Sequence, residues 1–351
     1  MKKIDLLSDT VTLPTPAMRS AMTSAAVGDD VYGEDPTVNH LQEMAAAILG
    51  KEAGLFVASG TMGNLVAILA HCRRGDEAML GHLAHTFLYE AGGISALGGV
   101  HSRQVLNQPD GTLALKDILD GIRPDDDHQP VTRLVSLENT HNRCGGVALT
   151  PEYTRSVGDL AQQHALVLHL DGARIFNAAV ALGVDVRQLV DPADSVTFCL
   201  SKGLCAPVGS VLCGNRDFIK QAHRIRKQLG GGMRQAGILA AAGIVALEQN
   251  IDRLAEDHAR ARRLADGLAQ IPGIQLDPNS PYTNMLFLSI SPEIPLGTKQ
   301  VAELLAERGV LVGAVGQRRF RLVTHYWIED RDVEQAVEAF AQTLQPARLV
   351  H

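Results

Sequence analysis

The sequence lacks several features that would place it in other classes of protein. Its 351 residues contain no apolar run that approaches the roughly 20 residues of a membrane-spanning helix. Five scattered cysteines form no C-x-x-C pair, which favours reduced thiols over a disulfide framework. The net charge of −7 gives no electrostatic reason to bind nucleic acid or an anionic membrane. The polar start MKKIDLLSDT does not have the pattern of a signal peptide, so we expect a cytoplasmic protein.

Two further absences reduce the number of candidate folds. The sequence has no internal repeat, low-complexity tract or long linker, and its length suits one large domain or two unequal ones. No G-x-G-x-x-G string follows an apolar run, which disfavours a dinucleotide-binding domain. A nicotinamide-dependent dehydrogenase is therefore a poor candidate.

Between about residues 36 and 250, helical patterns alternate with short apolar runs. The runs are Gly54–Ala58, Ala78–Gly81, Val100–Val105, Thr132–Leu137, Leu166–Leu170, Ser195–Leu200 and Gly209–Cys213. Helical patterns such as Met62–Cys72 and Thr150–Gln163 lie between most of them. The alternation predicts an α/β fold with a mostly parallel, seven-stranded sheet and helices on both faces.

The two ends of the chain have a different character. Residues 1–18, with Pro14 and Pro16, predict an extended arm. Residues 235–269 predict one long or kinked helix. Beyond it we expect strands at Met285–Ile290 and Phe320–Val323 and helices at Thr298–Arg308 and Asp332–Leu344. We therefore expect an N-terminal arm at 1–18, a large domain at 19–245 and a small α+β C-terminal domain at 246–351.

An acid and a lysine follow two neighbouring apolar runs. The string LVLHLDGARIFN ends its apolar run in Asp171, and the next run, in SVTFCLSKGL, ends just before Lys202. Parallel sheets place ligand sites at the carboxyl ends of their strands. A lysine can form a Schiff base with pyridoxal 5′-phosphate (PLP), and a carboxylate can keep the ring nitrogen protonated. The pair favours a PLP site over a strand-end turn and a surface lysine.

A PLP site also needs a phosphate-binding segment and a partner for the ring. Ser59, Gly60 and Thr61 stand between an apolar run and an amphipathic helical pattern. Amides at the helix start and the Thr61 hydroxyl could bind a phosphate dianion. The alternative is a plain helix start capped by Ser59 or Thr61. His85, just past another apolar run, could stack on the ring or be an ordinary loop histidine.

Taken together, these motifs resemble the low-specificity L-threonine aldolases, a branch of the fold-type I PLP enzymes. The resemblance covers nearly the whole chain and is carried by IDLLSDTVTLPTPAM at 4–18, GDDVYGEDPTVN at 28–39, SGTMGN at 59–64, AHTFLYEAGG at 84–93, SLENTHN at 136–142, HLDGARIFNA at 169–178, LSKGL at 200–204, PVGS at 207–210, GGGMRQAGILAAAG at 230–243, TNM at 283–285 and RLVTH at 321–325. It implies cleavage of L-threonine, L-allo-threonine and related β-hydroxy-α-amino acids to glycine and an aldehyde, with PLP as cofactor and no metal.

The resemblance also implies a role for each matching residue. Lys202 would be the Schiff-base lysine, Asp171 the partner of the ring nitrogen and His85 the stacking imidazole. The implied cofactor-binding set is completed by Ser59, Gly60, Thr61, Arg174, Asn142 and Arg234. The implied substrate-binding set is Ser8, Arg174, Arg321, Tyr32, Tyr89, His128 and Lys227. His85 and His128 are the candidates that contact the substrate hydroxyl, and either of them or a water that they hold could move its proton.

The resemblance further implies an assembly and leaves alternatives. Tyr32, Lys227 and Arg234 would contact a neighbouring subunit's site, so we expect a homo-oligomer, a tetramer by precedent, with active sites shared across the dimer interface. A serine hydroxymethyltransferase-like, β-eliminating or aminotransferase activity would use the same lysine, aspartate and arginines. A non-catalytic PLP-carrying regulator is disfavoured, because the chain shows neither a DNA-binding domain nor a damaged site.

Two cysteines near these motifs need comment. Cys205 stands where many members of the resembled family carry glycine. If that position requires a positive φ, cysteine is unfavourable there. Cys144 follows the SLENTHN string, but no general base adjacent in sequence supports it as a nucleophile. We expect Cys144 to be structural.

Overall fold

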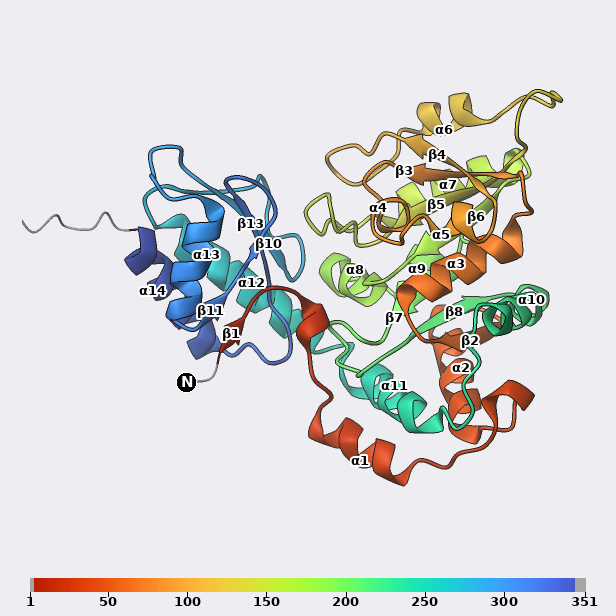
Figure 1. Ribbon diagram of the computed structural model, residues 1–351, viewed down its shortest axis with the longest axis horizontal. Coiled ribbons are helices and arrows are strands. Elements are labelled where there is room, and N and C mark those ends of the chain that lie inside the picture. Colours follow the sequence, from red (N-terminus) through yellow and green to blue (C-terminus); the bar gives the residue numbers. More distant parts are fainter. Residues whose placement is uncertain (1–2, 345–351) are drawn as a thin grey trace, which may run out of the picture. The chain divides into compact units, whose positions relative to one another are not determined.

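The computed structural model describes residues 3–344 of the chain. Contacts divide the chain into two compact units (Figure 1). The large unit is Leu13–Ile251, and the small unit combines the described parts of Met1–Thr12 and Asp252–His351. The expected arm at 1–18 and the expected domains at 19–245 and 246–351 stay predictions.

The large unit is built on a seven-stranded sheet of order β2-β8-β7-β6-β5-β3-β4. The strands are β2 Ala53–Val57, β3 Glu77–Gly81, β4 His101–Val105, β5 Thr132–Glu138, β6 Val167–Asp171, β7 Ser195–Cys199 and β8 Ser210–Gly214. β8 is antiparallel to both of its neighbours, and the other neighbouring pairs are parallel. The predicted mostly parallel seven-stranded sheet is confirmed, and each strand lies within one residue of its apolar run.

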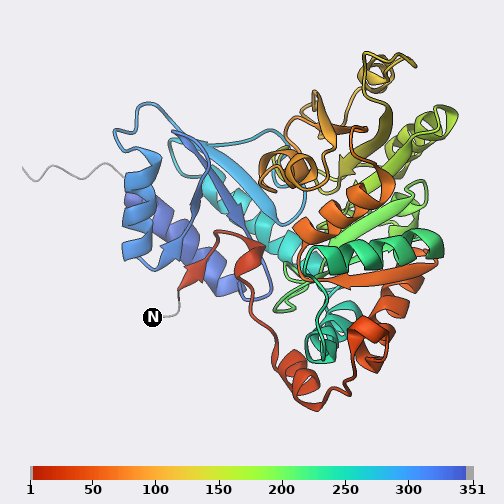
Figure 2. The same ribbon diagram turned by 45° about the vertical axis from the view of Figure 1, so that its right-hand side comes forward.

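Helices cover both faces of this sheet (Figure 2). The helices of the large unit are α1 Pro16–Ser24, α2 Pro36–Leu49, α3 Gly60–His71, α4 His85–Leu88, α5 Gly93–Ala96, α6 Leu115–Gly121, α7 Pro151–Gln163, α8 Ile175–Leu182, α9 Val186–Val190, α10 Arg216–Gln228 and α11 Gly237–Gln249. On one face α3 packs against α10, and a core that includes Leu55, Val57 and Val66 lies beneath them. Another connected layer is formed by α2, α9 and α7. All residues of β3, β7 and β8 are buried, as expected for strands covered on both sides.

The small unit is an α+β structure with its own core. Its antiparallel sheet has the order β12-β13-β10-β9, and a short parallel pair joins β1 to β11. The elements are β1 Ile4–Asp5, α12 Leu254–Ala269, β9 Ile274–Leu276, β10 Met285–Ile290, α13 Thr298–Glu307, β11 Val310–Leu311, β12 Gly313–Ala314, β13 Arg319–Val323 and α14 Asp330–Leu344. Residues from both ends of the chain, including Ile4, Leu6 and Phe340, share one hydrophobic core. The first residues are therefore part of this unit's structure.

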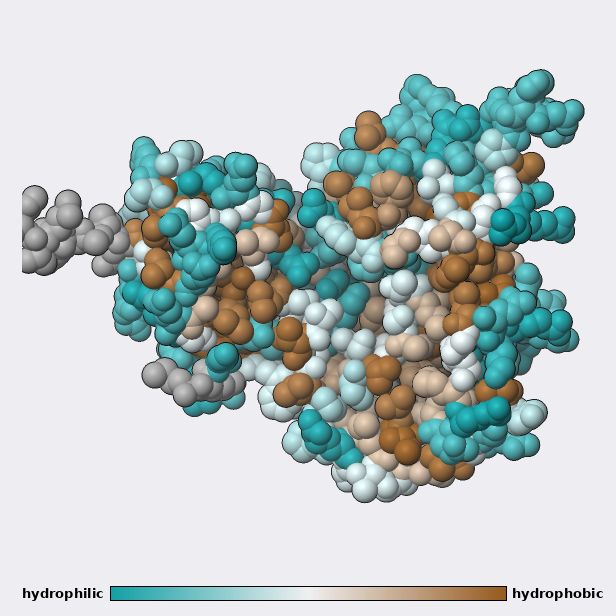
Figure 3. Space-filling view, in the orientation of Figure 1, coloured by the Kyte–Doolittle hydropathy of each residue, from teal (hydrophilic) through white to brown (hydrophobic). Residues whose placement is uncertain are grey.

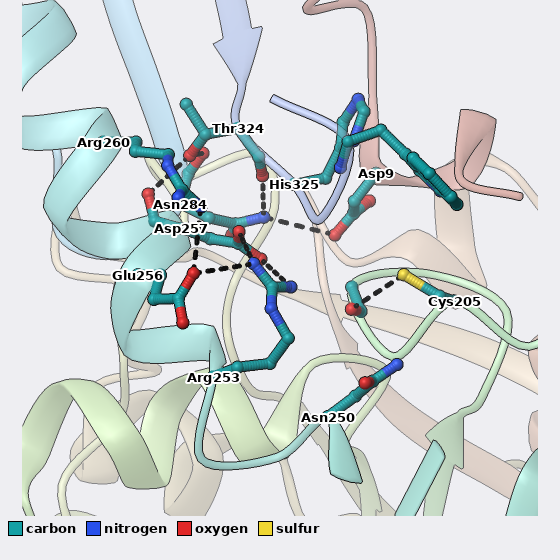
Figure 4. Close-up of polar contacts among 12 residues, drawn as sticks. Asp9, Cys205, Asn250, Arg253, Glu256, Asp257, Arg260, Asn284, Thr324 and His325 are labelled. Carbon is teal, nitrogen blue, oxygen red and sulfur yellow. Dashed lines mark hydrogen bonds and ion pairs between the residues drawn. The ribbon is translucent and has the colours of Figure 1, made fainter. Parts of the chain in front are cut away.

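A buried polar cluster in the small unit includes residues of two strings noted in the sequence, TNM and RLVTH (Figure 4). Asn284 donates to the Thr324 carbonyl oxygen at 3.0 Å and to Oδ2 of Asp9 at 3.4 Å. The Thr324 hydroxyl donates to the carbonyl oxygen of Asp257 at 2.7 Å. Arg253 binds the Asp257 carboxylate through both terminal nitrogens, at 3.2 and 2.6 Å. These bonds join α12, the residues that adjoin β10 and β13, and the N-terminal segment.

Two local expectations need correction. The predicted helix over 235–269 is two helices, because α11 ends at Gln249 and α12 begins at Leu254. The side chain of Asn250, at the end of α11, donates to the Leu204 carbonyl oxygen at 2.8 Å and so belongs to the large unit's loop structure. In the expected extended arm, α1 already begins at Pro16, since proline is well tolerated in the first helical turn.

No helix among residues 3–344 combines the length and apolar character needed to cross a membrane.

Candidate active site

The candidate site lies at the carboxyl edge of the large unit's sheet. β6 ends at Asp171, and Lys202 lies in the segment that follows β7. His85 begins the short helix after β3, and Ser59 follows β2. Since β2, β3, β6 and β7 run in the same direction, their carboxyl ends face one edge of the sheet. The fold therefore gathers side chains that are far apart in the sequence.

Asp171 is held by two hydrogen bonds at the end of β6. It is 4% exposed. Oδ1 accepts from the backbone N–H of Ala173 at 3.1 Å, and Oδ2 accepts from the side-chain nitrogen of Asn64 at 2.9 Å. A buried carboxylate is costly unless it is paired. The protonated ring nitrogen of PLP is a suitable partner, so the buried acid fits that cofactor.

The segment after β2 forms the start of α3 and packs closely on β7. Ser59 is the N-cap, and its hydroxyl accepts from the Met62 N–H at 3.1 Å. A Cβ on Gly60 would lie 2.9 Å from Sγ of Cys199, and one on Gly63 would lie 2.5 Å from Cγ2 of Thr197. Glycine at both positions therefore lets the helix start lie against the strand before Lys202. The Ser59 cap is present, and phosphate binding by this helix start stays a prediction, since a capped helix start also presents free amides.

His85 is joined to a second buried carboxylate. Its backbone N–H donates to Glu138 at 2.7 Å, and its ring Nδ1 lies 2.9 Å from Oε1 of Glu90. The hydrogen bond to Glu90 raises the pKa of His85, although burial opposes the effect. One polar atom from each of His85, Glu90 and Asp171 lies within 4.8 Å of the other two. Within this group His85 and Glu90 form an imidazole–carboxylate pair.

Lys202 and Arg174 line one small pocket with Asn177 and Cys199. Lys202 is half-buried, and Arg174 is 7% exposed at the start of α8. The positive charge of Lys202 acts to lower the pKa of His85, against the larger effect of Glu90. The pocket thus holds the amine and the guanidinium that PLP and a carboxylate substrate would need.

Cys205, three residues after Lys202, has φ = +69° and is fully buried. This left-handed conformation is the condition under which we expected cysteine to be unfavourable. The backbone N–H of Cys205 donates to the Lys202 carbonyl oxygen at 2.9 Å, so the turn is part of the lysine loop. Burial raises the pKa of Cys144 to about 11, which keeps that thiol protonated and fits the expectation that it is structural.

Asn142 and Tyr89 both lie beside the His85 segment. The backbone N–H of Asn142 donates to Oε1 of Glu138, whose other oxygen receives the N–H of His85. The ring of Tyr89 lies 5.5 Å from that of His85 and is half exposed. The structure therefore brings both predicted residues to the same edge of the sheet.

The three residues expected at a neighbouring subunit's site lie together on the surface. Tyr32 is 74% exposed, and the guanidinium of Arg234 lies 5.9 Å from its ring centre. Arg234 also pairs with Asp29 at 2.7 Å. A Cβ on Gly232 would lie 3.1 Å from the Lys227 side chain and 3.2 Å from that of Val31. Tyr32, Arg234 and Lys227 are therefore neighbours on one exposed surface of the large unit.

His128 lies elsewhere. It precedes β5, whereas the candidate site is at the opposite, carboxyl end of that strand. A seven-residue strand spans roughly 20 Å. The His128 side chain is 90% exposed and its Nδ1 lies 2.7 Å from Asp126. Within one chain, His128 and His85 are therefore not brought together.

Ser8 and Arg321 belong to the small unit. The Ser8 hydroxyl accepts from the N–H of Thr10 at 3.3 Å and begins a short 3-10 helix. Arg321, on β13, donates to the carbonyl oxygen of Leu7 at 3.1 Å. The two predicted carboxylate ligands are thus close to each other within this unit.

The sequence analysis missed several polar residues. Glu90 and Asn64 lie within recognised strings but had no assigned role. Asp35 caps α2 and also accepts from the N–H of Gly237 at 2.8 Å, which joins the 28–39 and 230–243 strings. Asp30 and Arg226 form a buried ion pair at 2.8 Å. In the sequence, each of these residues is simply a polar residue inside a motif or an apolar pattern. The residue that it pairs with becomes evident only from the fold.

The sheet topology and the two-unit organisation are those of solved threonine aldolases, which defines the fold class. A solved threonine aldolase from Leishmania major superposes with a TM-score of 0.83 at 23% identity, covering 97% of this chain and 99% of that one. Residues 5–291 match the model of the β-eliminating lyase family.

Two curated relatives that match nearly the whole chain are named as low-specificity L-threonine aldolases. A probable low-specificity L-threonine aldolase of Arabidopsis thaliana is 50% identical over 343 residues, covering 97% of each chain. The low specificity L-threonine aldolase of Escherichia coli K12 is 49% identical over 338 residues, covering 96% of this chain and 97% of that one. The chain belongs to the β-eliminating lyase family, among the relatives of the low-specificity L-threonine aldolases.

Proposed function

We propose that the protein is a PLP-dependent lyase that cleaves L-threonine, L-allo-threonine and related β-hydroxy-α-amino acids to glycine and an aldehyde. The observation that carries the proposal is the buried Asp171 at the end of β6, with Lys202 directly after the adjacent strand β7. The near-full-length identity to L-threonine aldolases supports the choice of reaction.

The residues at the carboxyl edge fit the cofactor. Lys202 would bind its aldehyde carbon, Asp171 its ring nitrogen and His85 its ring face. The start of α3, with Ser59, Gly60 and Thr61, would bind its phosphate, and Arg174 and Asn142, with Arg234 of a neighbouring subunit, would complete the set. When bound, PLP supplies an electron sink for the bond broken at the substrate's α-carbon.

The remaining residues would orient the substrate. Arg174, Arg321 and Ser8 are the proposed ligands of the α-carboxylate, since a guanidinium can bind a carboxylate with two hydrogen bonds. By binding the α-carboxylate, they would set which bond at the α-carbon stands perpendicular to the cofactor ring. This orientation selects the reaction. Tyr89 would border the side-chain end of the substrate.

A base must take the proton of the substrate's β-hydroxyl as the carbon–carbon bond breaks. His85 is suited to this step, because its ring lies at the site and its Nδ1 is already engaged by Glu90. His128 precedes β5, whereas the site lies at the other end of that strand, so His128 is too distant to act in the same chain's site. If it contacts a substrate, it does so in another subunit.

We also propose a homotetramer whose active sites are shared between subunits. The support is the exposed group of Tyr32, Lys227 and Arg234. Hydrophobic residues also gather on the visible surface of the large unit where Figure 1 labels α11, a helix on which Ile238 is 45% exposed (Figure 3). Light scattering coupled to size-exclusion chromatography measures the assembly directly.

The proposed reaction is tested by glycine and acetaldehyde release from L-threonine, L-allo-threonine and their D-enantiomers, with and without added PLP. We expect equimolar products from both L-isomers and none from the D-isomers, with a requirement for PLP. Keto-acid formation, a requirement for tetrahydrofolate, or no release from any isomer would contradict the proposal.

A further inference from the structure

Glu90 is a buried carboxylate that the proposed reaction names only as the partner of His85. Its side chain is 3% exposed. Oε1 lies 2.9 Å from Nδ1 of His85 and accepts from the side-chain nitrogen of Asn64 at 2.9 Å. Oε2 has no hydrogen-bond partner among the described residues. Burying such a group is unfavourable unless its neighbours compensate, so its place beside His85 needs an explanation.

Asn64 joins Glu90 to Asp171. Its Nδ2 lies 2.9 Å from an oxygen of each carboxylate and 3.3 Å from the Thr86 hydroxyl. An amide nitrogen can only donate, so both carboxylate oxygens act as acceptors. On the other side, Oδ1 of Asn64 lies 3.2 Å from Nε2 of His169, which fixes the orientation of the amide.

The same chain of hydrogen bonds continues away from the site. Nδ1 of His169 and Nε2 of His71 each lie 2.9 Å from the Ser195 hydroxyl. Burial lowers the pKa of His169 to about 3 and that of His71 to about 4, so both rings are neutral near pH 7. A neutral His169 that donates from Nε2 must accept at Nδ1. Each hydrogen bond in the series from His71 to Asn64 is therefore donated in the direction of the two carboxylates.

We propose that Glu90 is a positioning residue of the active site: held by Asn64, it accepts a hydrogen bond from Nδ1–H of His85 and leaves Nε2 of His85 for the substrate. The second ring nitrogen of a histidine is defined by the bond that the first one makes. Without the bond to Glu90, the neutral ring could carry its proton on either nitrogen, and Nε2 could be a donor or an acceptor. This inference rests on the function proposed above, because that function places His85 at the β-hydroxyl.

The charges around His85 support this arrangement. The hydrogen bond to Glu90 raises the pKa of His85, the Asp171 carboxylate acts in the same direction, and burial and Lys202 lower it. Burial raises the pKa of Glu90, while the donors His85 and Asn64 oppose it. At Oε1, Glu90 is the acceptor of the Asn64 bond and faces Nδ1 of His85. Glu138 also contacts His85, but only through the backbone N–H.

The test is ¹⁵N nuclear magnetic resonance of the full-length protein labelled at histidine. His85→Asn identifies the His85 signals, whose shifts report which ring nitrogen carries the proton. In the wild type we expect the neutral ring to be protonated at Nδ1. In Glu90→Gln the pKa of His85 should fall by roughly one pH unit, since the nearby negative charge is lost. In Glu90→Ala the preference for Nδ1 should disappear.

Glu138→Gln is the matched control, because it changes a carboxylate that binds the same residue without touching its ring. It should leave the His85 tautomer unchanged. The proposal is overturned if wild-type His85 is protonated at Nε2, or if both Glu90 variants titrate like the wild type. Should Glu90→Ala fail to fold, Glu90→Gln, which keeps the side-chain size, decides the question.

The readout also separates this inference from the proposed reaction. Glycine release by the wild type tests the reaction, whereas the tautomer of His85 tests the role of Glu90. A protein that releases no glycine but shows the Glu90-dependent tautomer would refute the reaction and keep the positioning role. Glycine release with a tautomer independent of Glu90 would do the opposite.

Discussion

At the scale of single residues, the backbone conformation at Cys205 restricts which side chains the loop after Lys202 can accept. Its φ of +69° is reached at a fully buried position, and its N–H donates to the carbonyl oxygen of Lys202. Residues with a Cβ pay about 1–2 kcal/mol in this left-handed region, and β-branched residues fit it worst. The cost is local to the turn that follows Lys202.

We therefore expect Cys205→Val to destabilise the protein more than Cys213→Val, because a β-branched side chain fits the left-handed region worst. Both cysteines are fully buried, but Cys213 lies in the extended strand β8, where valine is favoured. Urea unfolding of the two variants measures the difference. Equal losses of stability would show that φ at 205 is not the limiting factor.

The sequence predicted some residues of the site better than others. Asp171 and Lys202 could be selected because each follows an apolar run, and parallel strands bring such ends together. Glu90 and Asn64 could not, because their proximity depends on how α3 and the segment after β3 pack at the sheet edge. His128 was paired with His85 on the basis of resemblance, and the position of β5 separates them within one chain.

At the scale of elements, the contact between α3 and β7 positions the proposed phosphate site. Gly63 lies over Thr197, and a Cβ would approach Cγ2 of that residue to 2.5 Å. Contacts this short force the helix or the strand to move. Since Asn64 follows directly on the same helix, a displacement would also disturb its bond to Asp171.

Gly63→Ala should therefore lower stability by about 1–3 kcal/mol and weaken PLP binding. Gly93→Ala is the control, because its Cβ would make only an ordinary contact at 3.6 Å with Leu65. Thermal unfolding gives the stability, and fluorescence or absorbance titration with PLP gives the affinity. If both variants behave alike, the close approach of α3 to β7 is not important.

Strand positions in the large unit were predictable because covered strands are continuous apolar runs. The short strands β1, β9, β11 and β12 had no such signal, since they have two or three residues each and are defined by their partners. The break between α11 and α12 was also missed. Helical patterns on both sides of 250–253 continue one another, and only the Asn250 bond to the Leu204 carbonyl oxygen marks the end.

At the scale of the whole molecule, both units contain buried neutral histidines. Burial lowers the pKa of His169 to about 3, and that of His71 and of His258 to about 4. The unfolded chain binds protons at these histidines below about pH 6.5, whereas the folded chain does not until much lower pH. Folding is therefore opposed increasingly as the pH falls through this window.

We expect the free energy of unfolding to be highest above pH 7 and to decline from about pH 6.5 toward pH 4, by on the order of 1 kcal/mol per pH unit for each histidine. Urea unfolding at several pH values measures the slope. His258→Gln should make the slope shallower, while the exposed His128→Gln should not. A slope unchanged in His258→Gln would contradict the assignment.

The most direct test of the central claim compares Lys202→Ala with Lys220→Ala, a change at an exposed lysine of α10. Glycine release from L-threonine should be abolished in the first variant and unchanged in the second. Borohydride reduction of the wild type with PLP, followed by peptide mass mapping, should place the cofactor on Lys202. Retained glycine release by pure Lys202→Ala, or a label on another lysine, would contradict the account.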